Sequence, residues 1–297
     1  MTPYKTFAEK DSRFESHHLQ TFAEVQSRLI ALKNDGYYFR GQREASWKLV
    51  SAAQREWLGK NLQSRFCTIH DFIQSHVDYQ RSQANAQFTA QCSQLNDISV
   101  LSTMQHFGGP TPFLDFTTNT EAALFFATDW LQAAGSDEIT KWVSIYAWKP
   151  GDGAATASTN DLFNWEKIID LYGGLDAAKE YKTLKGLSTL FIRQNTGIFL
   201  QITNSRLQRQ GGLFLYSSAA LNASKPYEEL FEGMTAAKVV GHYEGLFLPK
   251  MVCLNFPKSL VPEVATHLQG QRITKVSLGL DTPHWSEDVY KGFLKTL

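Results

Sequence analysis

The fold prediction starts from the stretch Tyr37–Arg43, which has the sequence YYFRGQR. Three aromatic residues in succession favour a β-strand, because flat, stiff side chains suit a pleated, half-buried surface. The Asp-Gly pair before it ends a helix predicted over Leu19–Asp35. The strand then presents Arg40, Gly41 and Gln42 at its open end. A permanent cation beside a residue without a side chain suits an anion or nucleotide, although this stretch taken alone favours a solvated arginine.

Composition limits the classes of partner. The chain has 297 residues, 43% of them hydrophobic, and Lys plus Arg equals Asp plus Glu, so that any contact with nucleic acid must be local to a cleft. The three scattered cysteines, Cys67, Cys92 and Cys253, predict neither a disulfide framework nor a metal site. We find no signal peptide and no membrane-spanning run, and therefore expect a soluble, cytoplasmic protein with no membrane contact.

Two further stretches carry unusual patterns. In the sequence TPFLDFTTN, Phe113–Phe116 predicts a buried strand, and the spacing from Thr118 to Glu121 is that of a capping box that begins a helix. The third stretch, 204–216, predicts a polar helical turn, a break at a glycine pair, and a strand over Leu213–Tyr216.

The remaining pattern predicts a mixture of elements. Helices are expected from Arg55 to about Gln87 and over Ile98–Phe107, 161–187 (in two pieces), Leu260–Leu268 and His284–Leu297, and strands over Lys141–Trp148, Met251–Phe256 and Ile273–Leu278. Their irregular order predicts an α+β fold rather than a repeated βαβ series, and we expect residues 1–297 to form a single domain.

Three separated blocks and one helix pattern occur in a fixed order. They are YFRGQ at 38–42, QHFGGPTPFLDFTTN at 105–119, AALFFA at 122–127, and the stretch 204–214. Together they closely resemble the FRG domain, which is named for its Phe-Arg-Gly signature. The resemblance covers a core of about residues 20–220. Residues 221–297 carry no assigned motif and are expected to complete the fold with strands and helices.

FRG domains are similar to ADP-ribosyltransferases, as remote relatives. The resemblance implies mixed and antiparallel sheets that form a cleft surrounded by helices, with NAD as the substrate. It implies catalytic roles for Arg40, Thr117 and Gln210. It also implies that the residues binding NAD are Tyr38, Gly41, Gln42, His106, Asp115, Thr118 and Arg206.

The sequence departs from those enzymes at the third motif. Gln210 stands where they carry a catalytic glutamate, and an amide accepts a hydrogen bond from a ribose hydroxyl but cannot act as a base. Asp115 or His106 could supply the missing group, as could the downstream glutamates Glu228, Glu229 and Glu232. Structural roles stay open beside these: Asp115 could bond Arg40 or backbone amides, and Thr118 could cap a helix.

Three functions follow from these residues and from the resemblance. The first is an NAD-dependent ADP-ribosyltransferase, a toxin or phage-defence effector that modifies RNA, DNA or protein and has an antitoxin protein as a further partner. The second is a catalytically silent module that binds a nucleotide or nucleic acid. The third is a metal-free nuclease or other hydrolase that uses His106 and Asp115.

Overall fold

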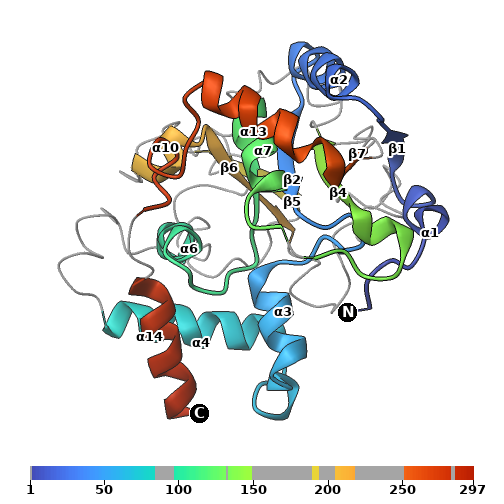
Figure 1. The fold of residues 1–297 in the computed structure, drawn as a ribbon. Coiled ribbons are helices and arrows are strands. Elements are labelled where there is room, and N and C mark those ends of the chain that lie inside the picture. Colours follow the sequence, from blue (N-terminus) through green and yellow to red (C-terminus); the bar gives the residue numbers. More distant parts are fainter. Residues whose placement is uncertain are drawn as a thin grey trace, which may run out of the picture.

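A seven-stranded mixed sheet lies at the centre of the protein (Figure 1). The computed structural model describes residues 2–83, 97–131, 133–148, 189–193, 205–217, 251–281 and 285–297. The strand order is β1-β7-β4-β2-β3-β6-β5, with β1 parallel to β7 and every other pair antiparallel. The strands are β1 Glu15–His18, β2 Tyr38–Gln42, β3 Leu114–Thr117, β4 Trp142–Trp148, β5 Thr189–Arg193, β6 Gly212–Ser217 and β7 Val252–Pro257. The predicted α+β class is confirmed.

Most of the helices form two groups beside the sheet. In Figure 1, α2, α7 and α13 lie above it, and α3, α4 and α14 form a separate group below it. The helices are α1 Phe7–Asp11, α2 Phe22–Asn34, α3 Ala52–Gly59, α4 Ile69–Ser82, α6 Asp97–His106, α7 Thr120–Thr128, α10 Ser205–Arg209, α13 Val261–Gly270 and α14 Trp285–Thr296. Three short 3-10 helices are η1 Leu62–Ser64, η2 Glu138–Lys141 and η5 Lys258–Leu260.

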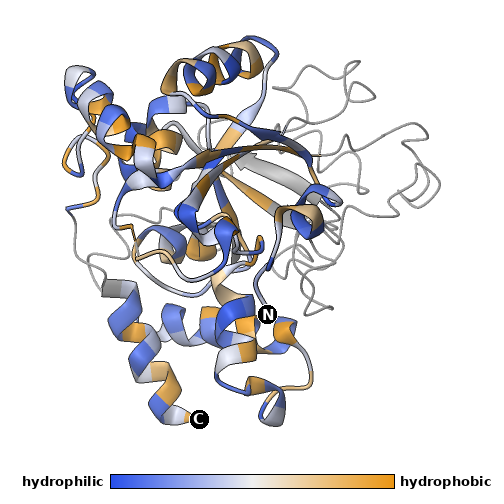
Figure 2. Ribbon diagram, turned by 45° about the vertical axis from the view of Figure 1, so that its right-hand side comes forward, coloured by the Kyte–Doolittle hydropathy of each residue, from blue (hydrophilic) through white to orange (hydrophobic). Residues whose placement is uncertain are grey.

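Buried apolar side chains form three clusters. One fills the space between the sheet and α2, α7 and α13 and contains Phe39 and Leu254, and a second joins α3, α4, α6 and α14 around Phe72. The third contains Tyr38 and Tyr146, whose strand neighbours Phe39 and Ile145 belong to the first cluster, so it covers the opposite face of the sheet. The outer helices alternate hydrophilic and hydrophobic stretches (Figure 2), as expected where one side of a helix is buried.

Strands β2 and β3 are paired over a very short length, and the candidate site lies at this place in the sheet. β2 pairs with β4 along its whole length, from Tyr38 to Gln42, and β3 pairs with β6 from Leu114 to Thr117. Between β2 and β3, however, the pairing consists of Phe39 opposite Thr117 alone. The two strands therefore diverge beyond that pair, and the sheet consists of two half-sheets, β1-β7-β4-β2 and β3-β6-β5.

Most of the predicted strands are confirmed, and two predicted elements are wrong. The expected helix from Arg55 to Gln87 is instead α3, η1 and α4, because Asn61 adopts a left-handed conformation and Thr68 begins a new helix with a capping box. The expected strand over Ile273–Leu278 is a series of turns, in which Leu278 N–H donates to the Thr274 carbonyl.

The start of α7 differs by one residue from the prediction. Asn119, rather than Thr118, is the N-cap, and its side-chain oxygen accepts hydrogen bonds from the backbone N–H groups of Glu121 and Ala122. The helices expected over 161–187 lie outside the described residues.

Candidate functional site

A cavity of about 1110 Å³ opens where β2 and β3 diverge. Its volume is slightly above the range of about 300–1,000 Å³ that is usual for small-molecule sites. Residues from the end of β2, from β3, from the loop after β2, from α3, from α10 and from the segment 275–280 line it. The missing pairing between β2 and β3 therefore leaves room for this cavity.

Positive charge dominates the lining of this cavity. Six cationic side chains line it: Arg40, Arg43, Lys48, Arg55, Arg206 and Lys275. Only two acidic residues, Asp115 and Asp129, accompany them among the lining residues, although the whole chain has no net charge. Crowding of cations and burial together lower the pKa of Arg55, where burial acts first and the charge of Arg40 next. Such a lining attracts phosphate or another anion.

Arg40 spans the divergence between the two half-sheets. Its Nη1 donates a hydrogen bond of 3.0 Å to the main-chain oxygen of Asp115, and the same nitrogen lies 3.9 Å from Asp115 Oδ2. The guanidinium therefore supplies a cross-strand contact just where ladder hydrogen bonds are missing between β2 and β3. Arg40 has this structural role whatever ligand the cavity holds, and the structural alternative for Asp115, a bond to Arg40, is realised.

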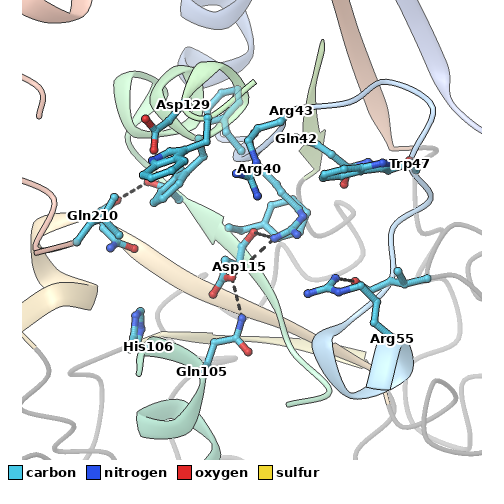
Figure 3. Close-up of a pocket in the computed structure, with 18 of the residues that line it drawn as sticks. Arg40, Gln42, Arg43, Trp47, Arg55, Gln105, His106, Asp115, Asp129 and Gln210 are labelled. Carbon is cyan, nitrogen blue, oxygen red and sulfur yellow. Dashed lines mark hydrogen bonds and ion pairs between the residues drawn. The ribbon is translucent and has the colours of Figure 1, made fainter. Parts of the chain in front are cut away.

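Asp115 presents its carboxylate to the cavity. Figure 3 shows Asp115 at the centre of the site, with Arg40 above it and Gln105 below it. Gln105 Nε2 donates to Asp115 Oδ2 at 2.7 Å, and the Thr111 hydroxyl bonds Gln105 Oε1, so that the amide is held with its N–H₂ group toward the carboxylate.

Two effects act in opposite directions on the pKa of Asp115. The side chain is half exposed to the cavity, but protein encloses it on its other sides, and this desolvation raises the pKa of Asp115. Arg40 and the Gln105 hydrogen bond oppose that rise. The result is a carboxylate that is reachable from the cavity and more basic than an ordinary aspartate.

The structure brings the three predicted catalytic residues, Arg40, Thr117 and Gln210, to the same cavity. Like Arg40, the other two are engaged in local structure. The Thr117 hydroxyl donates to the main-chain oxygen of Gln210 and accepts from Asn119 N–H at 2.8 Å. Gln210 Nε2 donates to the Leu278 carbonyl at 2.9 Å. Both side chains therefore clamp the start of β6 to neighbouring segments.

Five of the seven predicted NAD-binding residues line the cavity as well: Gly41, Gln42, His106, Asp115 and Arg206. Gln42 Nε2 donates to the Trp47 carbonyl at 2.6 Å and so fixes the loop after β2. Arg206 Nη1 donates to the His106 carbonyl. Burial lowers the pKa of His106 to about 3, with the charge of Arg206 as a second cause, so this imidazole is neutral near pH 7.

Tyr38 and Thr118, the other two residues predicted to bind NAD, are not among the residues that line the cavity. Both lie on the far side of the single Phe39–Thr117 pair from Arg40 and Asp115. Tyr38 is buried in the core, and the Thr118 hydroxyl donates to the Gly211 carbonyl at 3.3 Å. Glu228, Glu229 and Glu232, which were considered as substitutes for a catalytic glutamate, lie outside the described residues.

Gly41 has a packing role that the sequence did not indicate. A Cβ atom built on it would lie 2.0 Å from the Ala123 carbonyl oxygen and 2.6 Å from Ala127 N, both in the backbone of α7. Any side chain at this position would collide with the helix. The glycine is therefore required for α7 to approach β2, independently of any ligand.

Sequence reasoning missed several residues of the cavity. Trp47, Arg55, Trp130 and Lys275 line it from loops or helix ends and have no local motif. Figure 3 shows Trp47 and Arg55 on one side of Asp115, with Gln210 and Asp129 on the other. Arg43 could have been found, because it directly follows the Arg-Gly-Gln sequence of β2.

Within the described part of the chain, no three His, Cys, Asp or Glu side chains gather as metal ligands would. No helix there is both long and apolar enough to cross a bilayer. The cavity instead offers cations, a recessed carboxylate and tryptophan rings. These groups suit a ligand that combines negative charge with a planar ring.

Comparison with known proteins gives one result. No curated protein and no solved structure matches the chain significantly. A family model, described as the FRG domain, matches residues 35–135, a segment that includes β2, β3 and α7. This match supports the FRG family for the part of the chain that contains Arg40, Gly41 and Asp115.

Proposed function

We propose that the protein binds NAD in the cavity between β2 and β3 and transfers its ADP-ribose to a macromolecule. The observation that carries this proposal is a cavity of about 1110 Å³ that is lined by six cationic side chains together with the carboxylate of Asp115. The cations would hold the diphosphate of the dinucleotide. The assignment to ADP-ribosyl transfer itself comes from the resemblance of FRG domains to those enzymes.

Asp115 rather than Gln210 is the residue proposed to act on the reacting ribose. Cleavage of the bond between ribose C1′ and the nicotinamide nitrogen sends the electron pair to nicotinamide and leaves positive charge on the sugar. A fixed carboxylate close to that charge lowers the barrier, and such preorganised groups contribute about 10²–10³ in rate. The acceptor atom then bonds C1′, and its proton passes to the carboxylate of Asp115, whose raised pKa favours this step.

Gln210 and Thr117 are proposed as positioning residues. The Gln210 amide is held by the Leu278 carbonyl, and the Thr117 hydroxyl holds the main chain of Gln210. Their bonds keep β3, β6 and the segment before α14 in register around the cavity. The departure from glutamate at position 210 is therefore compatible with activity, because the carboxylate is supplied by a different strand.

The test is release of nicotinamide from labelled NAD by the full chain, with RNA, DNA and protein supplied as separate acceptors. We expect Asp115→Asn to lower the rate about 10²-fold or more, because the amide removes the charge and keeps the shape. Asp78→Asn, on an exposed carboxylate of α4 that does not line the cavity, is the matched control and should leave the rate unchanged. Equal rates for Asp115→Asn and the unchanged chain would refute the assigned role.

A catalytically silent nucleotide-binding module is the second candidate. The observation that favours it is the engagement of the Gln210 amide with Leu278, since no carboxylate stands at that position. This function predicts NAD binding without release of nicotinamide for any acceptor. The hydrolase based on His106 is disfavoured, because an imidazole with a pKa of about 3 is a poor base near pH 7.

A further inference from the structure

Trp130 has two features that are unusual for a large apolar residue. It lies two residues after the end of α7, and its side chain is 69% exposed although it is one of the largest apolar residues. Its backbone adopts φ of +56°, a left-handed conformation that bulky residues rarely occupy. Strain of this kind is retained where the surroundings or a function require it. The ring nevertheless belongs to the lining of the cavity.

The surroundings of this ring are polar and charged. The ammonium of Lys275 lies 4.1 Å from the ring centroid, in a cation–π contact, and 3.7 Å from the Asp129 carboxylate. Asp129, Trp130 and Lys275 therefore form one unit at the cavity, hereafter the Trp130 platform. Gln210, directly after α10, and Leu280, on the same segment as Lys275, line the same cavity.

We propose that the Trp130 platform stacks the nucleobase of a nucleotide whose phosphate contacts Lys275. An exposed indole is a good surface for any base, because every base has a π-face, and the neighbouring ammonium is placed to meet the phosphate attached to that base. The ligand chemistry is thus a planar heterocycle with a nearby phosphate. The inference rests on the proposed nucleotide site and adds to it the residues that recognise the base.

Two sources would supply this ligand chemistry. One is the adenine nucleotide half of NAD, and the other is a base of a single-stranded nucleic acid that serves as acceptor. The first predicts that the platform contributes to the affinity for NAD, and the second that it contributes to the affinity for an oligonucleotide. Separate binding measurements with NAD and with a single-stranded oligoadenylate distinguish the two.

The test measures the dissociation constants of both probes by calorimetry, on the full chain and on variants. Trp130→Leu keeps apolar bulk but removes the ring, and it should weaken binding of one probe by about 5- to 150-fold. Trp130→Phe keeps a ring and should recover most of that loss. Val276→Ala is the matched control, because Val276 is 62% exposed on the same segment as Lys275 but is not a lining residue.

A further variant separates a binding role from a structural one. Trp130→Gly removes the ring and also the left-handed strain, so its melting temperature should be kept or raised while binding is lost. A Trp130→Leu variant that binds both probes as tightly as the unchanged chain would overturn the inference and leave the NAD site standing. If the unchanged chain bound neither probe, both this inference and the proposed NAD site would be overturned.

Discussion

Replacing Gly41 by alanine should destabilise the fold rather than act on ligand binding alone. The added Cβ would lie 2.0 Å from the Ala123 carbonyl oxygen, whereas real Cβ atoms essentially never come closer than 3.0 Å to another heavy atom. The helix α7 would therefore have to move by about 1 Å, and it cannot avoid the clash by rotating a side chain, because the contact is with its backbone. This displacement would move the side chains of α7 away from Phe39 and Leu254, with which they form one apolar cluster.

The magnitude follows from what such overpacking costs. Inserting one methyl group into a close-packed interior costs about 1–3 kcal/mol, and a clash with the main chain belongs at the upper end, near 3 kcal/mol. With a urea m-value of about 3 kcal/mol/M for a chain of this size, the unfolding midpoint should fall by about 1 M. This loss is large compared with a total stability of about 5–15 kcal/mol.

Urea denaturation followed by circular dichroism measures this change. Gly59→Ala is the matched control, since Gly59 also lines the cavity, ends α3, and has no atom within 4 Å of its added Cβ. That variant should be neutral or stabilised by up to about 1 kcal/mol. A Gly41→Ala variant that unfolds at the same midpoint as the unchanged chain, yet fails to bind NAD, would refute the packing argument and favour a glycine kept for ligand approach.

Three further predictions concern stability. Lys10 is fully buried and donates three hydrogen bonds, to Ala45 O, Ser144 Oγ and Asn255 Oδ1. Lys10→Met should cost about 2–4 kcal/mol in urea unfolding because buried acceptors lose their donor, whereas the exposed Lys5→Met should cost almost nothing. Burial lowers the pKa of His76 and of His106 to about 3, below the ordinary 6.5, so the unfolded chain binds protons first as the pH falls. The part of the stability that depends on these two histidines is thus fully present above about pH 6.5 and is lost toward pH 3, by roughly 1 kcal/mol per histidine at pH 5.5. His76→Leu should reduce the difference in unfolding free energy between pH 7.5 and pH 5.5 by that amount, and an unchanged difference would contradict the assignment. Asn119→Ala should cost about 1 kcal/mol by loss of the α7 cap, and a melting temperature equal to that of the unchanged chain would exclude a capping role.

Sequence patterns anticipated those features that depend on neighbours along the chain. Alternating or continuous apolar residues located β4, β6 and β7, because burial on a sheet imposes a periodicity that is visible locally. The aromatic run before Arg40 likewise located β2 and placed its Arg-Gly-Gln end at the site. The wrong elements lay where the local signal was ambiguous, as in the apolar residues of 273–278, which form turns.

The amino-acid sequence by itself indicated five of the seven strands (β2, β3, β4, β6 and β7) and most of the helices, but not β1 or β5. It also indicated the three blocks that include Arg40, Thr117 and Gln210, since each depends on residues a few positions apart. Only the tertiary structure decided that β2 and β3 share a single pair, because strand pairing joins segments about 75 residues apart without a local signal. Where the two strands diverge, Asp115 lines a cavity, and Arg55, Trp130 and Lys275 line the same cavity. The chemistry of the site is therefore a property of the folded chain, since charges that cancel over the whole sequence are concentrated by the fold at one place.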